Sequence, residues 1–311
     1  MSEPEGRGTR PAADDGGTAA AGNVRAIVAV SLAMCSFACG DTLMKLASLS
    51  LPTSQLLFIR GGLIFVVSLG VAFYLGALRE LRHAFERPMV GRVVGDVGGG
   101  WFFQSALARM PYADLTAIGQ LSPMMLTAAS AIFLAERVGW RRWTATAVGL
   151  LGVLIIVRPG GSTFNWWALA GIASVLCTTV RDLSTRGINR RVPVSLIMTF
   201  SAGGVALAAL AVAPFSNWQW PDQLIMLKLM GAGMFSLLGQ LGVIIGMRTG
   251  EVSAVVPFRY TIILFSILSG VVVFGTFPDA LTMLGIAIVV LAGLYTFYRE
   301  QKLRRLAARQ S

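Results

Sequence analysis

The chain has 311 residues, of which 55% are hydrophobic and 13% are charged, and its mean hydropathy is +0.70. A soluble domain carries about 25% charged residues, so the composition excludes an ordinary soluble protein and indicates a polytopic membrane protein. The net charge of +11 does not indicate nucleic-acid binding, because the basic residues cluster in short loops between apolar segments. Residues 1–25 are polar and rich in glycine and alanine, which predicts a disordered tail.

Ten apolar segments follow, and they approach the roughly 20 residues with which a helix crosses a bilayer. Most of the 26 lysines and arginines fall in the tails and in alternate loops, which the positive-inside rule places in the cytoplasm. An even number of spans then puts both termini in the cytoplasm, with a basic tail over 300–311. The predicted spans are 26–48, 55–76, 89–108, 113–135, 143–157, 166–185, 193–213, 225–246, 252–275 and 280–298.

The two halves of the chain carry matching features at a nearly constant distance in sequence. Asp41 precedes Lys45 by four residues in the first predicted span, as Asp182 precedes Arg186 in the sixth. Glycine pairs, short polar turns and single prolines recur in the same order. Because each half has an odd number of spans, the second half must cross the membrane in the opposite direction. The sequence therefore predicts two inverted five-helix repeats, an architecture that is typical of secondary transporters.

Two stretches resemble a known family. One is LSPMMLTAASAIFLAERVGWRRWTATAVGLLGVLIIVRPGG, which includes Glu136, and the other is VVPFRYTIILFSILSGVVVFGTFPDALTMLGIAIVVLAGLYTFYRE. They are similar to the drug/metabolite transporter (DMT) superfamily, specifically to bacterial ten-span EamA-type carriers. The resemblance covers about residues 26–300 and implies the all-α EamA/DMT fold in the bacterial inner membrane, with repeats at 26–160 and 165–299. One departure is Gly275, where many relatives carry a glutamate.

The resemblance also implies a function. Members of the superfamily export amino acids and other metabolites or take up compounds such as riboflavin and S-adenosylmethionine, and the opening stretch GDTLMK…LP…Q…FIRGG is most similar to the subgroup with the latter carriers. We expect a secondary transporter for a small polar metabolite that is vitamin-like, nucleoside-like or amino-acid-like. The alternative within the family is efflux of an amino acid, another metabolite or a drug. The alternative of another class is an integral-membrane enzyme or a lipid-handling protein.

Features of catalysis are scarce in the sequence. The single histidine, His83, lies in a basic loop, and no cluster of His, Cys and acidic residues has the spacing of metal ligands. A phosphate-cradling P-loop is also missing from the sequence. We therefore expect no enzymatic activity, no cofactor, no metal and no nucleic-acid partner. The expected partners are a small-molecule metabolite and the lipid bilayer, and the sequence leaves a homodimer open.

Charged residues inside the predicted spans are candidate functional residues, because a charge at bilayer depth is costly and usually faces a partner or a water-filled path. Asp41 and Arg60 lie at similar depths in the first two spans. They either form an ion pair or leave Arg60 to bind an anionic or carbonyl group. Lys45 follows Asp41 by one helical turn, where it pairs with Asp41 or extends to the outer surface. Asp41 or Asp96 is the expected carrier of a coupled proton.

The inner half of the predicted bundle offers a second set of polar residues. Arg259 is expected at the depth of Asp96 and near the depth of Asp182, where it either pairs with Asp96 or has a ligand-binding or gating role. Trp101 is the only tryptophan in the middle of a predicted span. It either packs in the core or against lipid, or its ring stacks on a planar ligand. The predicted substrate-binding or gating residues are Arg60, Trp101, Gln120, Arg259 and Tyr260. The predicted ion-pair or proton-coupling residues are Asp41, Lys45, Asp96 and Asp182.

The third predicted span carries a regular glycine pattern. Gly91, Gly95 and Gly99 are spaced four residues apart. Small residues at this spacing lie on one face of a helix and let a neighbouring backbone approach closely. The pattern predicts that this span packs tightly against another helix.

Overall fold

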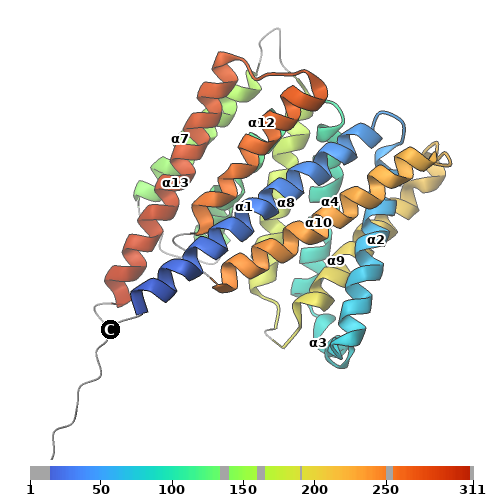
Figure 1. The fold of residues 1–311 in the computed structure, drawn as a ribbon, viewed down its shortest axis with the longest axis horizontal. Helices are drawn as coiled ribbons and strands as arrows, with labels where there is room; N and C mark the ends of the chain where they lie inside the picture. Colours follow the sequence, from blue (N-terminus) through green and yellow to red (C-terminus); the bar gives the residue numbers. More distant parts are fainter. Residues whose placement is uncertain (1–14, 134–139, 160–164, 190, 250–254, 309–311) are drawn as a thin grey trace, which may run out of the picture.

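The computed structural model describes residues 15–133, 140–159, 165–189, 191–249 and 255–308, and all secondary structure in these ranges is helical. Figure 1 shows long helices lying side by side with short connections. Helices satisfy their backbone hydrogen bonds within one segment, as a lipid environment requires. The elements are α1 (Asp15–Ala47), α2 (Thr53–Tyr74), η1 (Ala77–Glu80), α3 (Leu81–Ala84), α4 (Arg87–Leu107), α5 (Tyr112–Gly119), α6 (Ser122–Phe133), α7 (Trp140–Val157), α8 (Trp167–Arg186), α9 (Val194–Val212), η2 (Ala213–Phe215), α10 (Gln223–Thr249), η3 (Val256–Tyr260), α12 (Thr261–Phe274) and α13 (Ala280–Ala308).

Within the described residues, seven helical segments are long and apolar enough to cross a membrane, and a shorter apolar helix covers Trp143–Val157. Helices also form at the predicted spans 89–108 and 166–185, as α4 and α8, but these two helices do not belong to the seven. The reason is that each carries charged residues, which lower its hydropathy. The seven segments are Asn23–Ala47, Thr53–Tyr74, Tyr112–Phe133, Val194–Phe215, Gln223–Thr249, Pro257–Phe274 and Ala280–Arg299.

Two helices extend beyond the predicted spans at the ends of the chain. Helix α1 begins at Asp15 instead of residue 26, and α13 continues to Ala308 instead of residue 298. A run of alanines precedes residue 26 and favours helix, since alanine has the highest helix propensity. The predicted tail over 1–25 therefore includes helical residues from Asp15 onward, and its residues 1–14 lie outside the described ranges.

The main helix contacts join one helix from each half of the chain. Helix α1 packs along α10, α4 along α8, α2 along α9, and α7 along α13, as can be followed in Figure 1. Lesser contacts also occur in corresponding sets, namely α1 with α12 beside α6 with α8, and α4 with α9 beside α2 with α10. The two halves thus interlock, and the space between them is bounded by helices from both.

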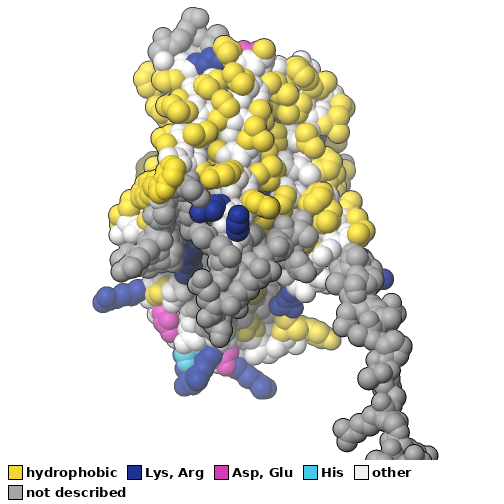
Figure 2. All heavy atoms as spheres, turned by 90° about the vertical axis from the view of Figure 1, so that its left-hand side faces the viewer, with side chains coloured by type: hydrophobic (Ala, Val, Ile, Leu, Met, Phe, Trp, Pro, Cys, Tyr) yellow, Lys and Arg dark blue, Asp and Glu magenta, His cyan; other side chains and the backbone are white. Residues whose placement is uncertain are grey.

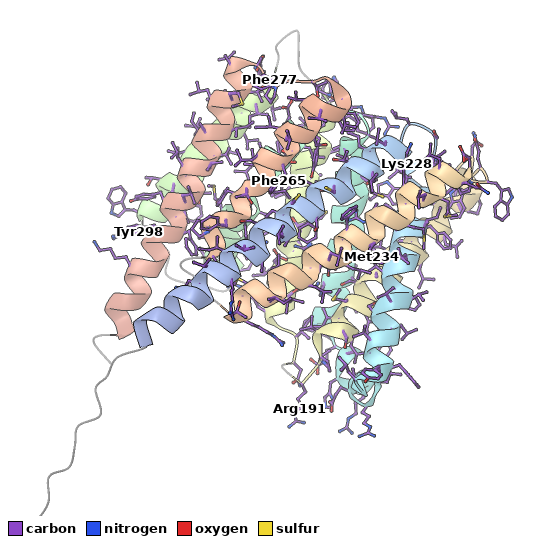
Figure 3. The ribbon with its side chains drawn as sticks, in the orientation of Figure 1. Arg191, Lys228, Met234, Phe265, Phe277 and Tyr298 are labelled. Carbon is purple, nitrogen blue, oxygen red and sulfur yellow. The ribbon has the colours of Figure 1, made fainter. Side chains whose placement is uncertain are left out.

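Hydrophobic side chains cover the outside of the bundle. Figure 2 shows them as a broad band over one face, with many of the visible lysines and arginines gathered below it. Figure 3 labels Met234 on α10, which is 58% exposed, and Tyr298 on α13, which is 74% exposed, and it places Arg191 at the lower end of the molecule. An apolar surface of this extent indicates contact with lipid.

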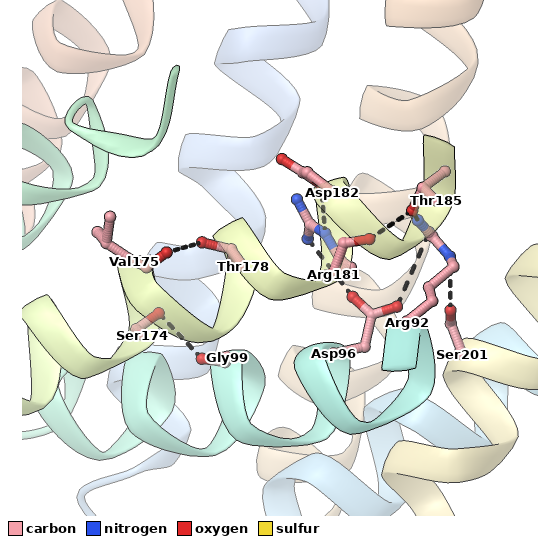
Figure 4. Close-up of polar contacts among 10 residues, drawn as sticks. All are labelled: Arg92, Asp96, Gly99, Ser174, Val175, Thr178, Arg181, Asp182, Thr185 and Ser201. Carbon is pink, nitrogen blue, oxygen red and sulfur yellow. Dashed lines mark hydrogen bonds and ion pairs between the residues drawn. The ribbon is translucent and has the colours of Figure 1, made fainter. Parts of the chain in front are cut away.

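The contact between α4 and α8 uses the predicted glycine face. A Cβ atom on Gly95 would lie 2.6 Å from the backbone nitrogen of Arg181 and 2.7 Å from the carbonyl oxygen of Cys177. One turn away, the Ser174 hydroxyl donates a 3.0 Å hydrogen bond to the Gly99 carbonyl, as Figure 4 shows. The prediction of close helix packing is confirmed, and the approach brings the charged ends of α4 and α8 together.

Gly95→Ala tests this contact. The added methyl group meets backbone atoms, which cannot rotate away, so we expect overpacking to lower the free energy of unfolding by roughly 1–3 kcal/mol. Gly62→Ala is the matched control, because Gly62 also lies within a helix and a Cβ there would meet nothing within 4 Å. Thermal unfolding in detergent should show a lower melting temperature for Gly95→Ala alone. Equal melting temperatures for the two variants would contradict the packing.

Candidate functional site

A cavity of about 470 Å³ lies between the two halves, and we call it the central cavity. Side chains from α1, α2, α4, α8, α9 and α10 line it. Its volume is within the range of small-molecule sites, about 300–1,000 Å³. The charged residues in its wall are Arg60, Arg92, Asp96, Arg181 and Asp182, and the larger apolar ones are Phe37, Leu57, Ile64, Met198 and Val205.

Four of the charged residues form one network, shown in Figure 4. The Asp96 carboxylate lies between two guanidinium groups, 3.4 Å from Arg181 Nη1 and 3.8 Å from Arg92 Nη2. Arg181 Nε also donates a 2.8 Å hydrogen bond to Asp182 Oδ1. We call these four residues the arginine–aspartate network. Because α4 supplies Arg92 and Asp96 and α8 supplies the other two, the close α4–α8 packing brings the charges together.

Hydroxyl groups complete the surroundings of Arg92. Its Nη1 donates to the Thr185 hydroxyl at 2.6 Å, and its Nε donates to the Ser201 hydroxyl of α9 at 3.2 Å. The Arg92 and Asp96 side chains are only 18% and 16% exposed. Burying charges is costly unless they are paired and hydrogen-bonded. The contacts meet this requirement for Arg92, whereas Asp96 Oδ2 is buried with an ion-pair partner, Arg92, but without a hydrogen bond.

Arg60 is the remaining charged residue in the described wall of the central cavity. Its Nη2 donates a 2.9 Å hydrogen bond to the Ser236 hydroxyl of α10, and its Nη1 lies 4.0 Å from Asp41 Oδ1. Asp41 Oδ2 accepts a 3.1 Å hydrogen bond from the Tyr112 hydroxyl. The ion pair that the sequence offered as one alternative for Asp41 and Arg60 is present, and Arg60 lines the cavity as well.

Lys45 has a different role from either alternative that the sequence offered. Its Nζ donates to the carbonyl oxygen of Leu107 at 2.7 Å and also to that of Met110. It lies 5.4 Å from the centre of the Phe274 ring. A cation at the carbonyl end of α4 interacts favourably with the helix dipole. Lys45 therefore stabilises the end of a helix outside the described wall of the cavity.

Besides Asp41 and Lys45, four more predicted site residues lie outside the described wall of the central cavity. Gln120 occupies the turn between α5 and α6. Tyr260 faces α13, where its hydroxyl would meet a Cβ added to Gly293. Arg259 lies in η3 with an exposed side chain. Trp101, on α4, is partly buried. The helices thus bring Arg60, Asp96 and Asp182 to one cavity and leave these four elsewhere.

The prediction that Asp96 pairs with Arg259 is wrong. Among the ion pairs of the described residues, Asp96 contacts Arg92 and Arg181 instead of Arg259. The sequence missed Arg92 and Arg181 because both lie near helix ends, where basic residues are expected as cytoplasmic flanks. The Arg181-Asp182 dipeptide inside an apolar segment was the available signal.

Two groups of contacts fasten the ends of helices away from the network. The Gln55 side chain at the start of α2 accepts a 3.2 Å hydrogen bond from the Gln219 backbone nitrogen and donates to the Gln219 carbonyl. Trp218 Nε1 donates to the Ser54 hydroxyl at 2.9 Å. We call these four residues the α2 clasp. It joins the start of α2 to the connection between α9 and α10.

The second fastening joins the end of α7 to the start of α13. Arg158 donates to both carboxylate oxygens of Asp279 and to the Thr282 hydroxyl. The hydrogen bond from Arg158 holds the pKa of the Asp279 carboxyl below its usual range, so Asp279 keeps its charge at neutral pH. Asp279 also accepts a hydrogen bond from the Thr282 backbone nitrogen at 2.9 Å and so caps α13.

The fold and the charged cavity define a multi-pass, all-α membrane protein with a polar site between its two halves. The model of the EamA-like transporter family matches residues 24–158. Residues 24–158 of this chain are therefore similar to a family of transporters.

Relatives cover most of the chain. A riboflavin transporter of Vibrio cholerae is 29% identical over 87% of this chain and 92% of its own. An S-adenosylmethionine uptake transporter of Rickettsia felis is 24% identical over the same shares. A pseudopaline exporter of Pseudomonas aeruginosa is 27% identical over 84% of this chain and 92% of its own. One crystal structure is similar at a TM-score of 0.58 and 21% identity, covering 89% of this chain and 98% of that one, which shows a likeness of fold alone.

Asp96→Asn tests the arginine–aspartate network. The change leaves two partly buried arginines without their shared counter-charge, and breaking such a pair costs roughly 3–5 kcal/mol. Asp182→Asn is the matched control, because Asp182 contacts one arginine and its side chain is 31% exposed. We expect Asp96→Asn to lower the melting temperature in detergent more than Asp182→Asn. An equal or larger loss for Asp182→Asn would mean that Asp96 is not the centre of the network.

Proposed function

We propose that the chain is a secondary transporter that carries a small polar metabolite across the bacterial cytoplasmic membrane by alternating access. The observation that carries this proposal is the central cavity, which has charged walls and is bounded by helices of both halves. Ionisable residues at membrane depth are costly and mark substrate or ion pathways. A substrate that contacts both halves can be exposed to either side when one half rocks against the other.

The proposal includes ten membrane-spanning helices in two inverted repeats, 26–160 and 165–299. In chain order, α1 of the first repeat corresponds to α8 of the second, α2 to α9, α4 to α10, α6 to α12 and α7 to α13. The helix contacts support the repeats, since exchanging each helix for its counterpart turns the α1–α10 contact into the α8–α4 contact. The same exchange turns α1–α12 into α8–α6 and leaves α2–α9 and α7–α13 unchanged. A two-fold relation between the halves accounts for this pattern.

The proposed topology gives the central cavity a direction. Its wall includes Arg181 and Asp182 from the end of α8 and Met198 and Ser201 from the start of α9. The connection between these two helices carries Arg191, which the positive-inside rule places in the cytoplasm. The α2 clasp then lies on the outer side. We propose that this arrangement is an inward-facing state of the carrier, with its outer end closed by the α2 clasp.

The relatives supply candidate substrates and roles. Two of them are named for riboflavin and S-adenosylmethionine, so uptake of a compound of either type is the first candidate. Efflux of a metabolite is the alternative, supported by the relative that is named as an exporter. We assign substrate contact to Arg60, proton coupling or ion pairing to Asp41, Asp96 and Asp182, and gating to Arg259.

Binding and transport by the purified protein test the function. In detergent, riboflavin, S-adenosylmethionine and a set of amino acids are screened for a rise in melting temperature, because a ligand at ~100 times its Kd stabilises the folded state by about 2.7 kcal/mol. Each compound that binds is then followed into liposomes containing the protein. We expect at least one compound to bind and to cross the membrane faster than in protein-free liposomes.

A pH gradient across the same liposomes tests coupling to protons. If the carrier is coupled to protons, we expect it to accumulate its substrate against the substrate gradient. Asp41→Asn and Asp96→Asn should abolish this accumulation while exchange of substrate persists. Binding without any passage across the membrane, for every compound of the panel, would contradict the proposed function.

A further inference from the structure

The charges in the wall of the central cavity do not balance. Among the described residues of the wall there are three arginines, Arg60, Arg92 and Arg181, and two aspartates, Asp96 and Asp182. Asp41, whose Oδ1 lies 4.0 Å from Arg60 Nη1, is not part of that wall. The cavity surface therefore presents one positive charge in excess.

Two of the three arginines are already committed to protein acceptors. Arg92 donates to Thr185 and Ser201 and lies beside Asp96. Arg181 donates to Asp182 at 2.8 Å and to Asp96 at 3.4 Å. A ligand that took these donors would have to break the arginine–aspartate network.

Arg60 differs from both. A guanidinium carries five N–H donors, and among the hydrogen bonds of the described residues Arg60 makes one, to Ser236. Arg60 Nη1 lies 4.0 Å from Asp41 Oδ1, which is too long for a hydrogen bond. The other carboxylate oxygen of Asp41 accepts a hydrogen bond from the Tyr112 hydroxyl. The Arg60 side chain is 23% exposed and lines the cavity. It keeps a charge and unused donors available to a ligand.

Apolar side chains make up much of the remaining wall, together with the polar side chains of Ser201 and Gln240. Leu57, Gly61 and Ile64 flank Arg60 on α2, and Phe37 and Val205 line the cavity from α1 and α9. We infer that the substrate of the proposed transport is a small organic compound that carries an anionic group, which favours an S-adenosylmethionine-like or amino-acid-like compound over riboflavin. One carboxylate or phosphate group binds Arg60 through two parallel hydrogen bonds, the geometry that guanidinium favours, and an apolar body lies against these side chains. That the bound compound is a substrate rests on the proposed function, whereas the anion site itself rests on the cavity alone.

The charge preference of the cavity can be measured without knowing the substrate. Val205→Cys places a thiol in the wall in a variant whose three native cysteines are replaced. Its rate of modification is compared for two methanethiosulfonate reagents, one with an anionic sulfonatoethyl group and one with a cationic trimethylammonioethyl group. The same ratio at Ser50→Cys, in an exposed turn after α1, corrects for the intrinsic reactivity of the reagents.

We expect the corrected ratio to favour the anionic reagent by about tenfold, since Arg60 lines the cavity whereas its partner Asp41 does not, and a charge acts strongly in a partly desolvated site. Adding Arg60→Gln should bring the ratio close to one, and Arg60→Lys should preserve it. Arg109→Gln is the matched control, because Arg109 is outside the described wall and stacks 4.3 Å from the Trp167 ring, so it should leave the ratio unchanged.

The modification rates separate this inference from the proposed function, because they require no transport. A ratio of one or below in the Val205→Cys protein would overturn the anion site even if transport were demonstrated. A tenfold ratio that survives Arg60→Gln would also overturn it, since the excess charge would then belong to the arginine–aspartate network. A tenfold ratio that depends on Arg60 supports the site even if no compound of the transport panel crosses the membrane.

Discussion

The placement of Asp96 between Arg92 and Arg181 is the interaction on which the site depends. Two arginines on neighbouring helices repel each other, and in a partly buried position the repulsion is not screened by water. The shared carboxylate offsets it and lets α4 and α8 approach until Gly95 touches the backbone of Arg181. This approach forms one wall of the central cavity and sets its charge, so close packing and polarity have the same origin.

The interlocked halves explain why the cavity lies where it does. Every main helix contact joins the two halves, so several polar contacts of the cavity wall cross from one half to the other. Arg92 of α4 reaches α8 and α9, and Arg60 of α2 reaches α10. A relative movement of the halves must therefore change these contacts together. Such a movement is the one that alternating access requires.

Much of the fold followed from the sequence, whereas the site followed only in part. Hydropathy predicted the helices, and the glycines of α4 predicted a close contact, because both depend on local patterns. Asp41 and Arg60 were found as intramembrane charges. Arg181 was missed because its position near a helix end resembles a cytoplasmic flank, and only the helix packing shows that it turns inward. The partner of Asp96 was assigned by depth alone, and depth does not say which helices are neighbours.

The most direct test of the account is to fasten its outer end permanently. Gln55→Cys and Gln219→Cys, in a variant without native cysteines, replace two residues of the α2 clasp whose contact joins α2 to the α9–α10 connection, and a short reversible thiol cross-linker then joins them. If the clasp closes the outer side and must open in each cycle, cross-linking should stop transport in liposomes, and reduction should restore it, while the singly substituted proteins treated in the same way stay active. Transport at the full rate in completely cross-linked protein would contradict alternating access around the central cavity.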